Sequence, residues 1–122
     1  MSLVLSNNTT TSRRIGGVAE QIAVDYLQSQ GLILVQQNFY SRFGEIDIIM
    51  RDHDTLVFIE VKKRVAGIDV ALESITWAKQ QKLVRAAKYY LAKINRDVAC
   101  RFDAVAIDKN NNCQWVKNII ML

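Results

Sequence analysis

The stretch 44-GEIDIIMRDHDTLVFIEVKK-63 holds two runs of strand-forming residues on either side of a polar turn. Glu45–Met50 and Thr55–Lys63 are rich in the β-branched and aromatic residues that favour strands, and Arg51–Asp54 is predicted to be a hairpin turn. The second run is almost continuously apolar from Leu56 to Val61, which is typical of a strand covered on both faces. We therefore expect this hairpin to lie inside a layered fold.

Helical patterns lie on both sides of this hairpin. Apolar residues recur at helical spacing from Ile15 until Gly31 stops the pattern, and again after Thr76, a candidate N-cap, to about Asn95. The other predicted elements are strands at Leu32–Phe39, Ala99–Ile107 and Gln114–Ile120, turns at Ser41–Gly44 and Asn110–Asn112, and a poorly patterned connection at Arg64–Ile75. The order α-β-β-β-α-β-β predicts an α/β fold with a mixed central sheet flanked by helices.

The length and composition restrict the class of protein. A chain of 122 residues is expected to form one domain, here residues 15–122, preceded by a flexible polar arm over residues 1–14. The arm lacks the apolar stretch of a signal peptide, and no apolar run approaches the roughly 18 residues that span a bilayer. We therefore expect a cytoplasmic protein without a membrane partner. Two cysteines are too few for a disulfide framework or a zinc cluster.

The basic residues are unevenly distributed. The formal net charge is only +4, which by itself is weak evidence for a nucleic-acid partner. The segment from Thr76 to Arg101, however, contains seven basic residues and one acid, Asp97. Lys79 lies at the edge of the first helical turn and is a candidate phosphate contact. The residues predicted on the outward face, where a solvated surface is commoner than a DNA groove, are Lys82, Arg85, Lys93 and Arg96.

Three residues of the central hairpin suggest metal chemistry. Glu60 and Lys62 are two residues apart in one strand, so they share a face with their Cα atoms roughly 7 Å apart. Pairing of the two strands would bring Asp47 close to Glu60. Two converging carboxylates form an oxygen-rich site suited to Mg²⁺, or Mn²⁺ in its place. The alternative is an ion pair of Lys62 with Glu60 or Asp47 and no metal.

Such a site contains the parts that phosphodiester hydrolysis needs. A metal polarises the phosphoryl oxygen and activates a bound water, and Lys62 would stabilise the charge of the transition state or, if its pKa were lowered, act as a general base. Glu20 flanks the buried stripe of the first helix, where it either reaches a metal-bound water or is a solvated helix residue. Gln80 falls inside the buried stripe of the second long helix and needs a partner, either in the site or elsewhere.

The chain lacks the signals of other hydrolases. It has one histidine, His53, and no Gly-x-Ser-x-Gly motif, which argues against a Ser or Cys triad. A glycine-rich phosphate loop is also missing from the sequence. The large aromatic residues Trp77, Phe102 and Trp115 are interpreted as packing residues.

The motifs Gly44-Glu45-Ile46-Asp47 and Val57-Phe58-Ile59-Glu60-Val61-Lys62 resemble the PD-(D/E)XK nuclease signature. The wider pattern is similar to the bacterial YraN family of that superfamily. Its other matching positions are Glu20, Ala23, Tyr26-Leu27, Asn38, Lys79-Gln80, Ala86-Ala87, Tyr90-Leu91 and Arg101-Phe102-Asp103. The resemblance implies a restriction-endonuclease-like fold similar to archaeal Holliday-junction resolvases. It also implies Asp47, Glu60 and the Val61 carbonyl as metal ligands, Lys62 as catalytic lysine and Glu20 as an outer acid.

The expected function follows from the site and this resemblance. We expect a Mg²⁺-dependent endonuclease that acts on DNA rather than RNA, with branched or damaged DNA in repair or recombination as its substrate. Resolvases work as dimers, so a homodimer is also expected. The predicted nucleic-acid contacts are Arg42, Lys63, Arg64, Lys79 and Lys82. The alternatives are a nucleic-acid-binding module without turnover and a structural or adaptor protein with an ion-paired core.

Overall fold

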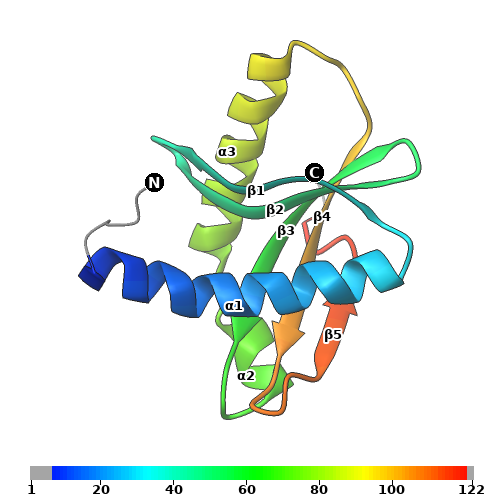
Figure 1. The fold of residues 1–122 in the computed structure, drawn as a ribbon. Helices are drawn as coiled ribbons and strands as arrows, with labels where there is room; N and C mark the ends of the chain where they lie inside the picture. Colours follow the sequence, from blue (N-terminus) through cyan, green and yellow to red (C-terminus); the bar gives the residue numbers. More distant parts are fainter. Residues whose placement is uncertain (1–6, 121–122) are drawn as a thin grey trace.

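A computed structural model describes residues 7–120, which form a mixed five-stranded sheet with helices on both faces (Figure 1). Within these residues the strand order is β1-β2-β3-β4-β5, and only the β3–β4 pair is parallel. The elements are α1 (Asn7–Ser29), β1 (Ile33–Ser41), β2 (Gly44–Asp52), β3 (Thr55–Lys63), α2 (Ile68–Glu73), α3 (Trp77–Ile94), β4 (Cys100–Ile107) and β5 (Cys113–Val116). The predicted fold class is confirmed.

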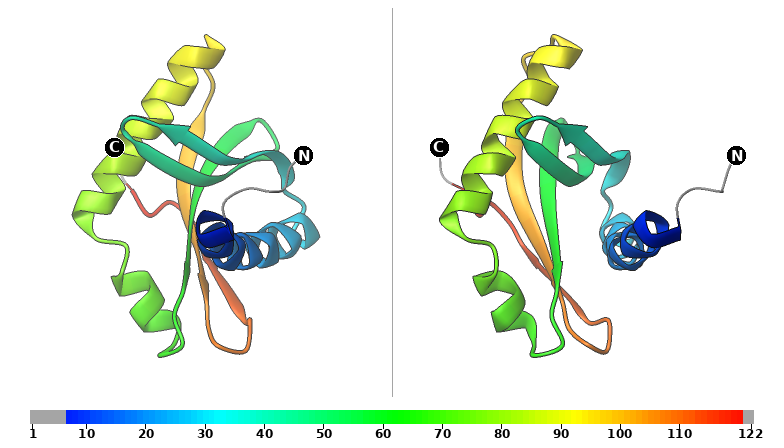
Figure 2. Two further views of the ribbon diagram at one scale, coloured as in Figure 1. Left: turned by 60° about the vertical axis from the view of Figure 1, so that its left-hand side comes forward. Right: turned by 90° about the vertical axis from the view of Figure 1, so that its left-hand side faces the viewer.

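The core consists of two apolar clusters separated by the sheet. Figure 2 shows α1 on one side of the sheet and α2 and α3 on the other. On β3, Val57, Ile59 and Val61 pack in the cluster with α1, whereas Phe58 packs in the cluster with α3. This alternation confirms that both faces of β3 are covered, as its apolar run predicted.

The predicted helix ends are formed by local backbone geometry. Gly31 adopts a left-handed φ of 99°, its N–H donates to the Gln28 carbonyl, and the Leu32 N–H donates to the Leu27 carbonyl, which together make a Schellman C-cap. At the start of α3 the Thr76 side chain accepts a hydrogen bond from the Lys79 backbone N–H, so the predicted N-cap is confirmed.

Several predicted boundaries differ from the structure. Helix α1 begins at Asn7 rather than Ile15, because apolar periodicity marks the buried face of a helix and not its full length. The connection before α3 contains the short helix α2, which buries Ala71 alone and so left no periodic signal. Strand β5 ends at Val116 rather than Ile120. Ile119 instead donates its backbone N–H to the Phe102 carbonyl after Asn118 adopts a positive φ of 58°.

The prediction that Trp77 is a packing residue is wrong. Trp77 is 74% exposed, whereas Phe102 is buried and Trp115 packs against the cluster below α1. Trp77 is the first residue of α3 and is absent from the buried residues of that helix. Within residues 7–120, none of the helices is long and apolar enough to cross a membrane.

Candidate metal centre

The site is formed where β2 and β3 separate. Their backbone pairing ends at Ile48 opposite Ile59, and beyond this point the Asp47 carboxylate replaces the backbone of β2 by accepting a 2.9 Å hydrogen bond from the Val61 N–H. Residues two apart in a regular strand share a face of the sheet. Ile46 and Ile48 do not: Ile46 packs in the cluster below α3, and Ile48 packs in the cluster below α1. Strand β2 therefore rotates about its axis at Asp47 and opens a fork in the sheet.

The fork exposes one backbone carbonyl of β3. The N–H groups of Leu56 and Arg64 donate to the carbonyls of Ala99 and Ile107, so even-numbered residues of β3 direct their backbone groups toward β4. The backbone groups of Val61 lie on the opposite edge, as its bond to Asp47 confirms. Since the N–H and C=O of one strand residue project to the same edge, the Val61 carbonyl faces the fork.

Four carboxylates gather at this fork from three elements. Oxygens of Glu20, on α1, and of Glu45 and Asp47, on β2, all lie within 4.8 Å of one another. Glu60 of β3 lines the same pocket as Asp47, and the two carboxyl groups are hydrogen-bonded. The Glu20 Oε1 atom is buried and has no hydrogen-bond partner among the described residues. An orphaned buried carboxylate oxygen in a set of hard oxygen donors fits a divalent cation such as Mg²⁺ or Mn²⁺.

Crowding of these acids raises the pKa of two of them. Burial raises the pKa of Asp47 to about 8, and the hydrogen bond and the charge of Glu60 raise it further. The hydrogen bond from the Val61 N–H and the charge of Lys62 act in the opposite direction. Burial, followed by the charges of Asp47 and Glu45, raises the pKa of Glu20 to about 7, although a hydrogen bond with Asn38 acts in the opposite direction. Near neutral pH the fork without a cation therefore retains protons.

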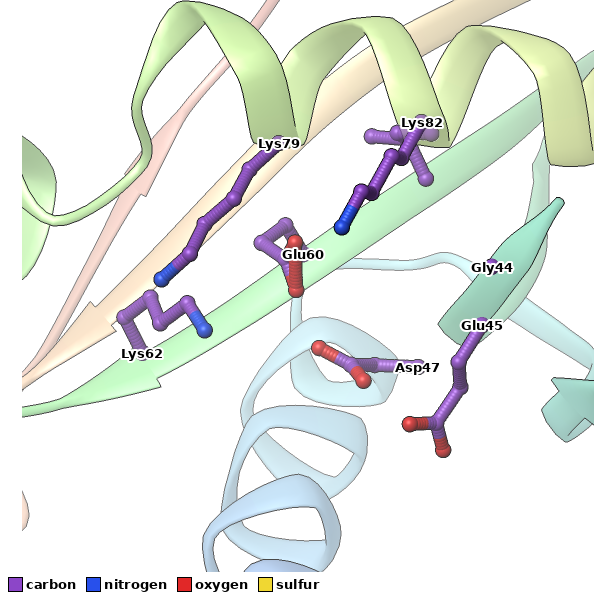
Figure 3. Close-up of a pocket in the computed structure, with 8 residues that line it drawn as sticks. Gly44, Glu45, Asp47, Glu60, Lys62, Lys79 and Lys82 are labelled. Atoms are coloured by element: carbon purple, nitrogen blue, oxygen red, sulfur yellow. The ribbon is translucent and has the colours of Figure 1, made fainter.

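Lysines lie on the other side of the same pocket. Figure 3 shows Lys82 extending from α3 toward Glu60, and Lys79 extending from α3 toward Lys62 of β3. The charge of Lys62 is the main cause that lowers the pKa of Lys79, so the two amines are close enough to repel each other. An anion placed between them would relieve this repulsion. The central pocket is lined by Gly44, Glu45, Asp47, Glu60, Lys62, Lys79, Lys82 and Leu83.

A second, flanking pocket shares Asp47 and Lys62 with the central pocket. It is lined by Ala19, Glu20, Asp47, Val61, Lys62, Lys63, Arg64 and Val65. The Lys63 amine donates to the Asn111 side chain at 2.8 Å, and the Arg64 guanidinium donates to the Lys63 carbonyl at 2.8 Å. The fork is thus reached from two pockets, each containing basic side chains.

The predicted site residues fall into two groups. Glu20, Asp47, Glu60, the Val61 backbone and Lys62 meet at the fork, with Lys63, Arg64, Lys79 and Lys82 lining its two pockets. Gln80 lines neither pocket. Its side chain is half-buried, and its amide donates to the Ile75 carbonyl at 3.2 Å, so its partner is the backbone between α2 and α3. Arg42 lies in the β1–β2 turn over the Phe43 ring and lines neither pocket.

Two interpretations from the sequence are corrected by these positions. Lys82 is exposed but not directed away from the site, because the strongly twisted β1–β2 hairpin brings Gly44 against its side chain and makes it part of the central pocket. The alternative of an ion pair between Lys62 and Glu60 or Asp47 is also wrong for the described residues. Their ion pairs join Asp52 to His53 and Arg101, and Arg101 to Asp103, and none involves Lys62.

Asp103 has a structural role that the residue pattern did not reveal. It is fully buried and accepts hydrogen bonds from the Arg101 guanidinium, the Trp115 indole N–H and the Asn118 backbone N–H. These contacts hold β5 and the segment after it against β4. An acid in the middle of an apolar strand, two residues after an arginine, was the signal that could have indicated this network.

The comparisons with known proteins agree with the resemblance noted in the sequence. A model of the uncharacterised protein family UPF0102 matches residues 19–107. A UPF0102 protein of Nitrosomonas eutropha is 48% identical over 110 residues, covering 89% of this chain and 95% of its own. A UPF0102 protein of Chromohalobacter salexigens is 49% identical over 118 residues, covering 93% and 96%. One of Psychromonas ingrahamii is 50% identical over 105 residues, covering 84% and 86%.

Proposed function

The chain belongs to the uncharacterised protein family UPF0102, and we propose that it is a divalent-metal-dependent nuclease that hydrolyses DNA phosphodiester bonds at the β2–β3 fork. The family description names no activity, so the proposal is supported by the site. The observation that carries it is the meeting of Asp47 and Glu60 with Lys62 in one pocket, where sequence pattern and tertiary contacts agree.

The residues at the fork divide into metal-holding and phosphate-holding groups. Asp47, Glu60 and the Val61 carbonyl would hold Mg²⁺, with Glu20 and Glu45 close enough to bind the cation or its water. Bound there, Mg²⁺ would polarise a phosphoryl oxygen and lower the pKa of a coordinated water. Lys62 stabilises the negative charge that develops on the phosphoryl oxygens, and Lys79 holds a neighbouring phosphate across the pocket.

The raised pKa values of Asp47 and Glu20 add a pH dependence to this chemistry. Both groups must be ionised to bind a cation, so metal binding displaces protons from the fork. Cleavage at limiting Mg²⁺ is therefore expected to rise between about pH 6 and 8. The rise should move to lower pH when the Mg²⁺ concentration is increased.

The experiment compares wild type with Lys62→Ala on linear, nicked and four-way DNA, in Mg²⁺ and in Mn²⁺. We expect the wild type to cleave at least one substrate and Lys62→Ala to lose roughly a hundredfold or more in rate, as electrostatic stabilisers of this kind do. Lys88→Ala, at an exposed position on another side of α3, is the matched control and should keep wild-type activity. Cleavage by Lys62→Ala at the wild-type rate would refute the assignment of Lys62.

A nucleic-acid-binding module without turnover is the alternative function. It is favoured if the wild type binds DNA with a salt-dependent affinity but cuts none of the three substrates with either metal. Preference for the four-way substrate would support a role in recombination, and a homodimer detected by sedimentation would suit the two scissile strands of such a junction.

A further inference from the structure

A cation–aromatic surface lies beside the central pocket, between the β1–β2 hairpin and α3. It consists of Arg42, Phe43, Tyr89 and Lys93, and the buried Phe39 ring joins Tyr89 to Lys93. The Arg42 guanidinium lies 4.8 Å from the centre of the Phe43 ring, and the Phe43 and Tyr89 ring centres are 5.8 Å apart. Tyr89 is 6.2 Å from Phe39, whose ring is 5.9 Å from the Lys93 amine.

The surface continues directly from the proposed phosphate site. Lys82, which lines the central pocket, precedes Tyr89 by seven residues, and Lys93 follows Tyr89 by four. These spacings place the three side chains along one line of α3 that extends roughly 16 Å from the pocket. On the opposite side of the surface, Phe43 is followed by Gly44 and Glu45, which also line the pocket.

Packing alone does not explain the exposure of Tyr89. The neighbouring Tyr90 is 7% exposed and makes an edge-on contact with Phe39 at 5.1 Å, which already secures the hairpin to the helix. Tyr89 is 42% exposed, and its ring lies between those of Phe43 and Phe39. Each of these two rings contacts a cationic side chain, Arg42 or Lys93. An aromatic ring that is partly open to solvent, with cations on its neighbouring rings, suits a ligand with flat faces and negative charges.

We propose that this cation–aromatic surface binds an unpaired segment of the nucleic-acid substrate next to the scissile phosphate. Tyr89 stacks on an exposed base, and Arg42, Lys82 and Lys93 contact the flanking phosphates. An intact duplex hides the faces of its bases, so stacking selects DNA with a single-stranded or splayed strand beside the cut. The inference rests on the proposed nuclease function and specifies its substrate.

The first test measures binding of fluorescein-labelled single-stranded and blunt duplex oligonucleotides in EDTA, where no cleavage occurs. Tyr89→Leu keeps apolar bulk against Phe39 and Phe43 but removes the aromatic face, and Tyr89→Phe keeps both. We expect Tyr89→Leu to bind the single strand roughly tenfold more weakly, Tyr89→Phe to bind it like wild type, and both to bind the duplex unchanged. Unfolding temperatures of both variants show whether the fold is kept.

A second test locates the strand on the surface without a mutation. An oligonucleotide carrying 5-iododeoxyuridine is irradiated with the wild-type protein, and the cross-linked peptide is sequenced by mass spectrometry. We expect the cross-link at Tyr89 rather than at the buried Tyr90. Arg42→Ala should lower the salt dependence of single-strand binding by about 0.7 in slope, whereas Lys88→Ala, about 100° round the helix from Tyr89, should leave binding unchanged.

These results separate the inference from the proposed function. Equal single-strand binding by wild type and Tyr89→Leu, an equal loss on the duplex, or a cross-link confined to other elements would overturn the inference. If wild type cleaves DNA under those outcomes, the nuclease proposal still stands. If Tyr89→Leu loses single-strand binding but wild type cuts nothing, the surface is a binding site and the nuclease proposal fails.

Discussion

Replacement of Asp47 by asparagine should stabilise the protein in the absence of divalent metal. The Asp47 carboxylate lies against Glu60 and near Glu20, and its pKa is raised to about 8. In the unfolded chain the pKa of an aspartate is close to 3.9, so the folded state binds this proton more tightly. Stability should therefore fall as pH rises between about 4 and 8, and the whole cost is present above pH 8.

The size of the effect follows from that difference in pKa. About four units at about 1.4 kcal/mol each set an upper limit of roughly 6 kcal/mol. The fork can relax when Asp47 ionises, so we expect a smaller gain of roughly 2–5 kcal/mol at pH 8. Asparagine keeps a carbonyl oxygen that can accept the Val61 N–H bond, so the variant removes charge and not the acceptor.

The assay is urea unfolding in EDTA at pH 5, 6.5 and 8. Wild type should become less stable as pH increases, whereas Asp47→Asn should show a much flatter dependence and exceed wild type at pH 8. Asp54→Asn, at an exposed position in the β2–β3 turn, is the matched control and should follow wild type. A variant less stable than wild type at pH 8, or a wild type whose stability increases from pH 5 to 8, would refute the reasoning.

Three further predictions concern the metal, the buried acid and the amide on α3. Saturating Mg²⁺ at pH 8 should raise the Tm of wild type by several degrees but leave that of Asp47→Asn almost unchanged, as measured by differential scanning fluorimetry. Equal shifts in the two proteins would contradict binding at the fork. Asp103→Ala should cost about 3–5 kcal/mol in urea unfolding, because the half-buried Arg101 and Trp115 donors lose their fully buried acceptor. A loss below about 1 kcal/mol would show that water replaces it. Gln80→Ala should lower stability by about 1 kcal/mol and leave kcat unchanged, because the Gln80 amide donates to the Ile75 carbonyl. A tenfold fall in kcat would instead give Gln80 a role in the reaction.

The tertiary structure changes the interpretation of several residues that the sequence had singled out. Lys82 was expected on an outward face because helical periodicity describes one helix in isolation. It lines the pocket because the β1–β2 hairpin bends over α3 and brings Gly44 against it. Gln80 was expected in the buried stripe but is half-buried. Whether its partner was a ligand or the backbone at Ile75 depended on the path of the chain between α2 and α3.

The sequence by itself determined the hairpin, the two long helices and the shared face of Glu60 and Lys62, because alternation and helical periodicity are properties of short segments. Only the tertiary structure decided that β2 leaves β3 at Asp47, that Glu20 of α1 joins this opening, and that α3 brings Lys79 across from Lys62. These positions depend on contacts between residues far apart in the chain. No local pattern encodes where two strands separate or which helix crosses the gap.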